Sequence, residues 1–280
     1  MDVVVLGSGS PLPDPRRAGP ATLVTAGEHH LLVDTGRGVL MRLAATGVGV
    51  DRLDAVLLTH LHSDHVTDLA DVITTHWIFS FEPRSLRVIG PAGTQALVDA
   101  TLAALETDIG YRTRHHEDLT WSPIVEVDEV SSGDQVMFGD LTVTVATTAH
   151  QPVEPTVAYR VTDHEGAAAV LAGDTVPCAD LDRLTAGAGV LVHTVIRKDL
   201  IEHAGLQRMR DICDYHSGTS EVAQTAARAG VDTLVLTHLV PAPADDEAAA
   251  EWSRLVRDAG YHGDVVVADD LDRVKVPPSS

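Results

Sequence analysis

The chain has 280 residues, of which 44% are apolar and 22% charged, enough for one large globular domain with a full core. Its 20 basic and 41 acidic side chains give a net charge of −21, so the field of the whole molecule repels nucleic acid. Two cysteines, Cys178 and Cys213, lack metal-binding spacing, and no basic leader or long apolar span is present, so we expect a cytoplasmic protein outside the membrane.

Short β-branched runs alternate with helical patterns along the chain, and no Pro- or Ser-rich linker divides them. The strands are predicted at Val3–Leu6, Leu31–Val33, Ala55–Leu58, Arg87–Ile89, Leu141–Ala146, Thr156–Val161, Ala168–Leu171, Val190–Val192, Val231–Leu236 and Asp264–Ala268. The helices are predicted over Gly38–Ala45, Thr94–Ala104 and Glu221–Ala229, and around apolar stripes that begin at Val66 and at Ala248. We therefore predict a single domain over residues 1–280, with 275–280 as a frayed tail.

The stretch HLHSDH, from His60 to His65, places four side chains of metal-ligand type within six residues. It follows an apolar strand and precedes a helical stripe, so a turn there can point these side chains toward one cation. Neutral imidazole and carboxylate suit zinc, and also manganese or iron. The alternative is a polar helix N-terminus capped by Asp64, which leaves the other ligand types in the stretch unexplained.

Three further candidate ligands, His150, Asp174 and His238, each follow a predicted strand. Each of them alone is typical of a polar residue at a strand end. Together with the HLHSDH stretch they supply seven ligands, enough for two ions that share one carboxylate. Because His60 and His238 end two similar Thr-His-Leu strands in opposite halves of the chain, we predict two facing β-layers with helices outside. This is an αββα sandwich of the α/β class.

These motifs resemble the metallo-β-lactamase superfamily, whose fold is the αββα sandwich, over nearly the whole chain. The stretches LGSGSPLPDPRRAGPATLV, LLVDTGRGV, AGDT and YHSGTSEVAQTAARAGVDTLVLTHLVP are most similar to its ribonuclease Z and arylsulfatase-like branch. The resemblance implies two metal ions, expected to be zinc: the first held by His60, His62 and His150, the second by Asp64, His65 and His238, with Asp174 bridging.

The resemblance also implies a hydrolase in which a metal-bridging hydroxide attacks an ester. Asp64 would orient that hydroxide, and His216 would protonate the leaving group, since imidazole titrates near neutral pH. His193 is the third candidate catalytic residue. The family commonly has His-Glu where this chain has His193-Thr194, and the replacement weakens the proton relay that the resemblance implies. Asp34, in the DTGRG turn, is expected to support a metal ligand from behind.

For the substrate we predict a small-molecule ester: a phosphodiester, a sulfate ester, or a lactone or other carboxylic ester. The ribonuclease Z family carries a long RNA-binding arm between its third-histidine and bridging-aspartate motifs, whereas 24 positions (174 − 150) separate His150 from Asp174 here. This short segment and the acidic charge make nucleic acid an unexpected partner. A homodimer stays open, although such a dimer would have no arm to lend.

Three questions remain open: the function, the role of one segment and the place of three aromatic residues. The chain could be a ribonuclease Z that processes the 3′ side of transfer RNA, or a metal-binding or redox protein that hydrolyses nothing. The segment Asp199–Tyr215 is either a mobile lid over the site or a plain amphipathic connection. The aromatic residues Trp77, Phe79 and Phe81 either wall a substrate pocket or pack in the core.

Overall fold

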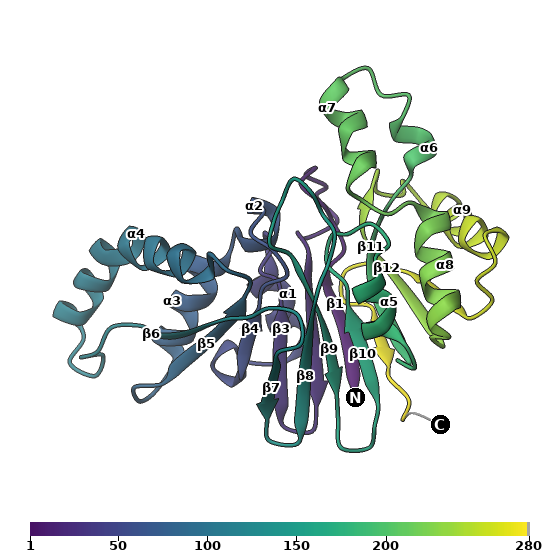
Figure 1. The fold of residues 1–280 in the computed structure, drawn as a ribbon. Coiled ribbons are helices and arrows are strands. Elements are labelled where there is room, and N and C mark those ends of the chain that lie inside the picture. Colours follow the sequence, from purple (N-terminus) through teal and green to yellow (C-terminus); the bar gives the residue numbers. More distant parts are fainter. Residues whose placement is uncertain (279–280) are drawn as a thin grey trace.

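The computed structural model describes residues 1–278 and contains two seven-stranded sheets packed face to face, with helices on both outer faces (Figure 1). This arrangement confirms the predicted αββα sandwich. Within residues 1–278, no helix combines the length and the apolar character that a membrane span requires.

The first sheet has its strands in the order β14, β1, β2, β3, β4, β5, β6. Their bounds are β14 (Arg273–Lys275), β1 (Asp2–Gly7), β2 (Ala21–Ala26), β3 (His29–Val33), β4 (Ala55–Leu57), β5 (Ser85–Gly90) and β6 (Ile124–Glu129). The four strands from β14 to β3 pair antiparallel, and those from β3 to β6 pair parallel.

The second sheet has the order β13, β12, β11, β10, β9, β8, β7. Its strands are β13 (Asp264–Val267), β12 (Thr233–Val240), β11 (Val190–Ile196), β10 (Ala168–Leu171), β9 (Val157–Thr162), β8 (Leu141–Thr147) and β7 (Gln135–Phe138). Here β13 to β10 pair parallel and β10 to β7 antiparallel. The first sheet thus holds the strands up to β6 together with the C-terminal β14, the second holds β7 to β13, and each sheet is mixed.

Alternate side chains of each strand divide between the two faces of its sheet. In β1, Val3 and Val5 lie in the core between the sheets, while Val4 and Leu6 lie in the core under the helices. The first sheet is covered by α1 (Val39–Thr46), α3 (Leu69–Phe79) and α4 (Thr94–His115), and the second by α5 (Ala179–Thr185), α8 (Thr219–Ala229) and α9 (Asp246–Asp258). Short elements complete the fold: η1 (Val50–Arg52), α2 (Ser63–Val66), α6 (Lys198–Ile201), α7 (Gln207–Arg210) and η2 (Asp211–Asp214).

Several elements are longer than the sequence predicts, and helix α4 shows the largest difference. Helix α4 continues 11 residues past the predicted end at Ala104 (115 − 104), and it runs away from the sheets, so that only Thr94 and Val98 are buried (Figure 1). No apolar stripe marks a helix that leaves the core, which is why periodicity missed it. Strands β2, β6, β7 and β14 were also not predicted. The tail prediction is wrong at its start, because Lys275 pairs with Asp2 and Val276 is buried, while residues 279–280 lie outside the described part.

The candidate ligands lie where the ends of several strands meet. Asp34 follows β3, His60 follows β4, and Asp174 follows β10. His238 differs from the prediction, because it lies inside β12 instead of after a strand ending at Leu236. The pairing of β11 with β12 shifts register beyond Thr194, and His238 there has a left-handed backbone with a φ of 53°.

Candidate metal centre

All seven residues that the sequence singles out as ligands lie in one cluster. The structure gathers His60, His62, His150 and Asp174 in one group, and Asp64, His65 and His238 in a second, with the ligand atoms of each group within 4.8 Å of one another. A third group joins Asp174 to His216 and His238. Asp174 is therefore the side chain that connects the groups.

In the first group the nitrogen atoms converge closely. His62 Nδ1 lies 3.0 Å from His60 Nε2 and 3.3 Å from His150 Nε2. Asp174 Oδ2 lies 3.8 Å from both His60 Nε2 and His150 Nε2. Donors about 2.0–2.1 Å from a tetrahedral zinc ion stand about 3.3 Å apart, so this group has the spacing of a four-ligand site.

The second group has a similar spacing around the same oxygen. Asp174 Oδ2 lies 3.5 Å from the Nε2 atoms of both His65 and His238. Asp64 Oδ2 lies 3.6 Å from His65 Nε2 and 3.2 Å from His238 Nε2. Because one carboxylate oxygen serves both groups, the cluster is compatible with a binuclear metal site.

In the described part of the chain, several buried polar atoms of the cluster lack a hydrogen-bond partner, which a bound cation could replace. Asp174 is 2% exposed, and within residues 1–278 its Oδ1 has no hydrogen-bond partner. The same holds for Nε2 of His65, which is 1% exposed. A buried carboxylate left without full compensation is costly, whereas bound cations would satisfy these atoms. The residues present therefore fit a pair of divalent ions.

The histidines of the first group are neutral at neutral pH. Burial lowers the pKa of His60 well below its usual value, and the charge of nearby His65 acts in the same direction. Burial also lowers the pKa of His62, and it lowers the pKa of His150 to about 4. Neutral imidazole is the form that binds a metal, so protons compete little with an ion in this group.

The pKa values of the histidines in the second group shift in the opposite direction and are raised. Burial would lower the pKa of His65, but the carboxylates of Asp174 and Asp34 outweigh it and hold that pKa well above its usual value. Against burial, Asp174 and the hydrogen bond to Asp64 also raise the pKa of His238. An ion that binds this group must therefore displace protons that are still held near neutral pH.

This contrast predicts stepwise metal loss on acidification. A raised imidazole pKa means that protons compete with the ion from a higher pH downward, so the second group should release its ion before the first. We expect elemental analysis after dialysis at steps from about pH 8 down to about pH 3 to show two separate losses, because the pKa of His150 in the first group is lowered to about 4. Release of both ions in a single step would contradict the assignment of these two groups.

Hydrogen bonds to residues outside the ligand set hold the imidazole rings of the ligands in place. His65 Nδ1 donates to Asp34 Oδ2 at 2.8 Å, as the sequence predicts for the DTGRG turn. Asp34 also accepts from the backbone N–H and the hydroxyl of Thr59, both at 2.8 Å. His150 Nδ1 donates to the carbonyl of Tyr215 at 2.8 Å, a contact that the sequence did not indicate. Asp34, like His238, has a left-handed backbone, with a φ of 60°, and such strain concentrates at functional sites.

Replacing Asp34 with asparagine should weaken metal binding without removing a ligand. The amide cannot hold His65 and Thr59 as the carboxylate does, and the loss of such outer partners typically costs 10–100-fold in metal affinity. Competition with a chelator would measure this change. Asp54→Asn is the matched control, because the Asp54 carboxylate accepts hydrogen bonds from His29 and His30 at the other end of β3. Equal metal affinities in the two variants would contradict the role of Asp34.

The three candidate catalytic residues lie in different places. Asp64 belongs to the second group, and His216 presents Nε2 to Asp174 Oδ2 at 3.2 Å. His216 Nδ1 donates to the carbonyl of Ile212 at 3.0 Å, so a backbone group orients the ring. His193 is buried in β11, belongs to none of the three groups, and donates from Nδ1 to the carbonyl of Thr194. The structure does not bring His193 to the cluster.

Thr194, which stands where the family has glutamate, also takes no part in the cluster. Its hydroxyl donates to the carbonyl of Gly173 at 2.9 Å. Because Ile212 already holds the ring of His216 through its carbonyl, that ring is oriented without a carboxylate from β11.

A cavity of about 300 Å³ opens beside the ligands. One side is formed by cluster residues, including His62, Asp64 and His216. The other side is apolar, and the sequence did not indicate it, because its members come from loops and from short helical turns without periodicity. These members are Leu12, Met209, Ile212 and Tyr215.

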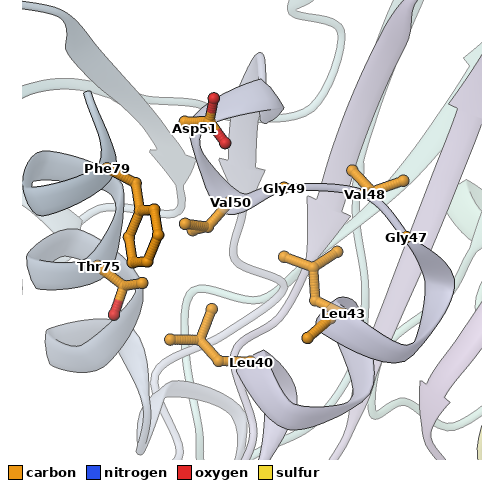
Figure 2. A pocket seen from close by; sticks show the side chains of 10 residues that line it. Leu40, Leu43, Gly47, Val48, Gly49, Val50, Asp51, Thr75 and Phe79 are labelled. Atoms are coloured by element: carbon orange, nitrogen blue, oxygen red, sulfur yellow. The ribbon is translucent and has the colours of Figure 1, made fainter. Parts of the chain in front are cut away.

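A second hollow of about 300 Å³ lies between α1, η1 and α3 and is shown in Figure 2. Leu40, Leu43 and Phe79 point into it. None of the candidate metal ligands lines it. Trp77 is buried in the core, where its Nε1 donates to the carbonyl of Trp121, and Phe81 is 98% exposed. The aromatic residues of this region therefore do not wall the cavity beside the cluster.

Comparison with known proteins gives consistent matches. Residues 29–239 match the model of the Beta-lactamase superfamily domain. A ribonuclease Z of Mycolicibacterium paratuberculosis is 55% identical over 282 residues that span 100% of both chains. A ribonuclease Z of Mycolicibacterium gilvum is 52% identical over 284 residues, 99% of this chain and 97% of the relative. In fold, the chain resembles the short form of human tRNase Z, with a TM-score of 0.72 and 21% identity over 99% of this chain and 100% of that one.

These relatives contradict the prediction of a small-molecule substrate with nucleic acid as an unexpected partner, because they are named ribonucleases. That prediction rested on the short segment between His150 and Asp174 and on the net charge of −21. The alignment with the Mycolicibacterium paratuberculosis protein covers both chains in 282 positions, which leaves about two positions (282 − 280) for insertions relative to this chain. A protein named ribonuclease Z therefore also lacks a long arm at this place, and the missing arm does not exclude RNA.

Proposed function

Because this chain belongs to the beta-lactamase superfamily and, within it, to the ribonuclease Z family, we propose that it is a metal-dependent ribonuclease Z that cuts precursor transfer RNA on its 3′ side. We also propose that it acts in the cytoplasm and as a single domain. The observation that carries the proposal is the single oxygen of Asp174 that two groups of ligand atoms share, with His216 beside it.

The chain's own residues suggest how ions would be held. His60, His62 and His150 would hold one ion, and Asp64, His65 and His238 the other, with Asp174 between them; zinc suits this set of nitrogen and oxygen donors. When bound, two such ions would supply the positive charge that lowers the pKa of water and stabilises charge on a phosphoryl group.

Two side chains are suited to moving protons around the phosphate. Asp64 points its Oδ2 into the cluster, where a carboxylate can orient the attacking water. His216 Nδ1–H is held by Ile212, so Nε2 is the nitrogen that faces the reacting groups and can protonate the leaving oxygen. We propose no step for His193, since its ring lies outside all three groups.

The experiment that tests this function compares two substrates with one metal-loaded preparation. A precursor transfer RNA with a 3′ trailer and the small ester bis(p-nitrophenyl) phosphate are incubated over a salt series. We expect one cut at the 3′ side of the RNA, and no cut with Asp64→Ala, which controls for contaminating nucleases. An intact precursor at every salt concentration, together with steady hydrolysis of the small ester, would contradict the proposed function.

A further inference from the structure

The apolar side chains that form a wall beside the metal ligands have no role in the proposed phosphate chemistry. The wall consists of Leu12 from the loop after β1 and of Met209, Ile212 and Tyr215 from the segment between β11 and α8. Leu12 is 48% exposed, although it is a large apolar side chain at the mouth of a cavity. Exposed apolar side chains that converge at a cavity are typical of a ligand site.

The wall is tied directly to the ligands. The carbonyl of Tyr215 accepts the hydrogen bond from His150 Nδ1, and the Tyr215 ring packs edge-on against the His150 ring at 5.2 Å. The same ring lies 4.9 Å from the ring of His216. The carbonyl of Ile212 holds His216 Nδ1. The apolar surface therefore has a fixed position relative to the atoms that would bind the scissile phosphate.

The segment that carries the wall is anchored at its base. In Figure 1 it forms the projection of α6 and α7 beyond the ends of the strands. Arg197, 5% exposed, pairs with Asp199 at 2.7 Å and with Glu251 at 3.4 Å, and its guanidinium lies over the Trp252 ring at 5.8 Å. Ile212 packs against a small core of Ile196, Ile201 and Val240. The wall is thus part of a supported element and is preformed for a ligand.

The charge of this segment argues against a site for phosphates alone. Residues 197–215 contain four basic side chains, Arg197, Lys198, Arg208 and Arg210, and four acidic ones, Asp199, Glu202, Asp211 and Asp214. The segment has no net charge and the whole chain has a net charge of −21. The phosphates of a nucleic acid are therefore attracted only weakly to this segment. A flat, apolar ligand gains more, since bases stack on aromatic and apolar side chains without regard to sequence.

We propose that Leu12, Met209, Ile212 and Tyr215 form a slot for the base of a nucleotide next to the scissile phosphate. This inference rests on the proposed function, because it places the phosphate at the metal ligands. The cavity of about 300 Å³ lies at the lower end of the range for small organic ligands, ~300–1,000 Å³. The slot would hold the RNA by stacking on its base.

The test measures binding by isothermal titration of the metal-loaded protein, so that no turnover is needed. The probes are adenosine and uridine 5′-monophosphate, with methyl phosphate as the ligand that carries the same phosphate group without a base. We expect both nucleotides to bind about tenfold more tightly than methyl phosphate, with little difference between the two bases. Equal dissociation constants for nucleotides and methyl phosphate would overturn the slot.

The variants Leu12→Ala and Met209→Ala each shorten one apolar side chain of the slot and should each remove most of the advantage of nucleotide over methyl phosphate. Leu12 is exposed on a loop, so its replacement tests the slot even where Met209→Ala unfolds the projection. The matched control is Leu206→Ala, also exposed on the projection at 51% but outside the cavity, which should keep the wild-type ratio. Retention of that ratio in both slot variants would overturn the proposal. Cleavage of precursor transfer RNA by the same wild-type preparation is scored separately, so failure of the slot is distinguishable from failure of the enzyme function.

Discussion

Replacing Asp174 with alanine is expected to remove both metal ions and to abolish hydrolysis. Asp174 Oδ2 lies 3.5–3.8 Å from ligand nitrogen atoms of both groups, so it is the carboxylate that connects them. Without that carboxylate, five histidines would surround the two ions, with Asp64 as the one negative ligand to balance their charge. Elemental analysis of the purified variant should show a fall from about two ions per chain to less than one.

The control for Asp174→Ala is Asp182→Ala. Asp182 pairs with Arg228 on the surface of the second sheet's helices, and its loss should leave the metal content as in the wild type. Circular dichroism would show that both variants are folded. Two ions per chain in Asp174→Ala would exclude Asp174 from the centre and with it the shared ligand on which the proposed function rests.

Replacing Asp64 with alanine is expected to slow hydrolysis by orders of magnitude while the fold persists. Asp64 is both a candidate ligand and the carboxylate that we propose orients the attacking water, and such positioning typically contributes 10²–10⁴-fold to a rate. Its pKa is below the usual value: burial would raise it, but the hydrogen bond from His238 and the charge of His65 prevail, so the ionised form persists at neutral pH.

Steady-state rates on bis(p-nitrophenyl) phosphate, beside the metal content, would measure the effect. Asp71→Ala, an exposed aspartate on α3 a few residues further along, is the matched control and should keep the wild-type rate. Near-normal turnover of Asp64→Ala would rule out the proposed role.

The sequence predicted the sandwich and the clustering of the ligands because both depend on local patterns. The HLHSDH stretch concentrates ligand types in a turn, and β-branched strands end in His150 and Asp174. The apolar wall could not be predicted. Leu12 and Met209 lie in segments without periodicity, and they meet only because the two sheets bring the loop after β1 next to the projection of α6 and α7.

Two predicted element ends, that of the strand before His238 and that of helix α4, were wrong for the same reason, because each was inferred from sequence pattern alone. His238 was placed after a strand, but β12 continues through it, because Val240 finds a new partner in Ile196 after the register shift. Helix α4 was cut at Ala104, since the part that leaves the core needs no apolar stripe. Strand pairing sets the end of β12, and solvent exposure lets α4 extend without an apolar stripe. The residue pattern alone encodes neither of these.

The prediction of a small-molecule substrate failed for a different reason. Net charge describes the field far from the molecule, whereas a substrate meets local groups at short range, and salt screens the far field over about 10 Å at 0.1 M. A chain with a net charge of −21 can therefore still bind RNA at a site built from metal ligands and apolar side chains.

The most direct test of the central claim is a metal titration of metal-free wild-type protein, scored by cleavage of precursor transfer RNA. If two ions sharing Asp174 form the centre that cuts RNA, a single cut at the 3′ side should reach its full rate only as the second equivalent of zinc binds. Full cleavage at one ion per chain, or an intact precursor at two, would contradict the account.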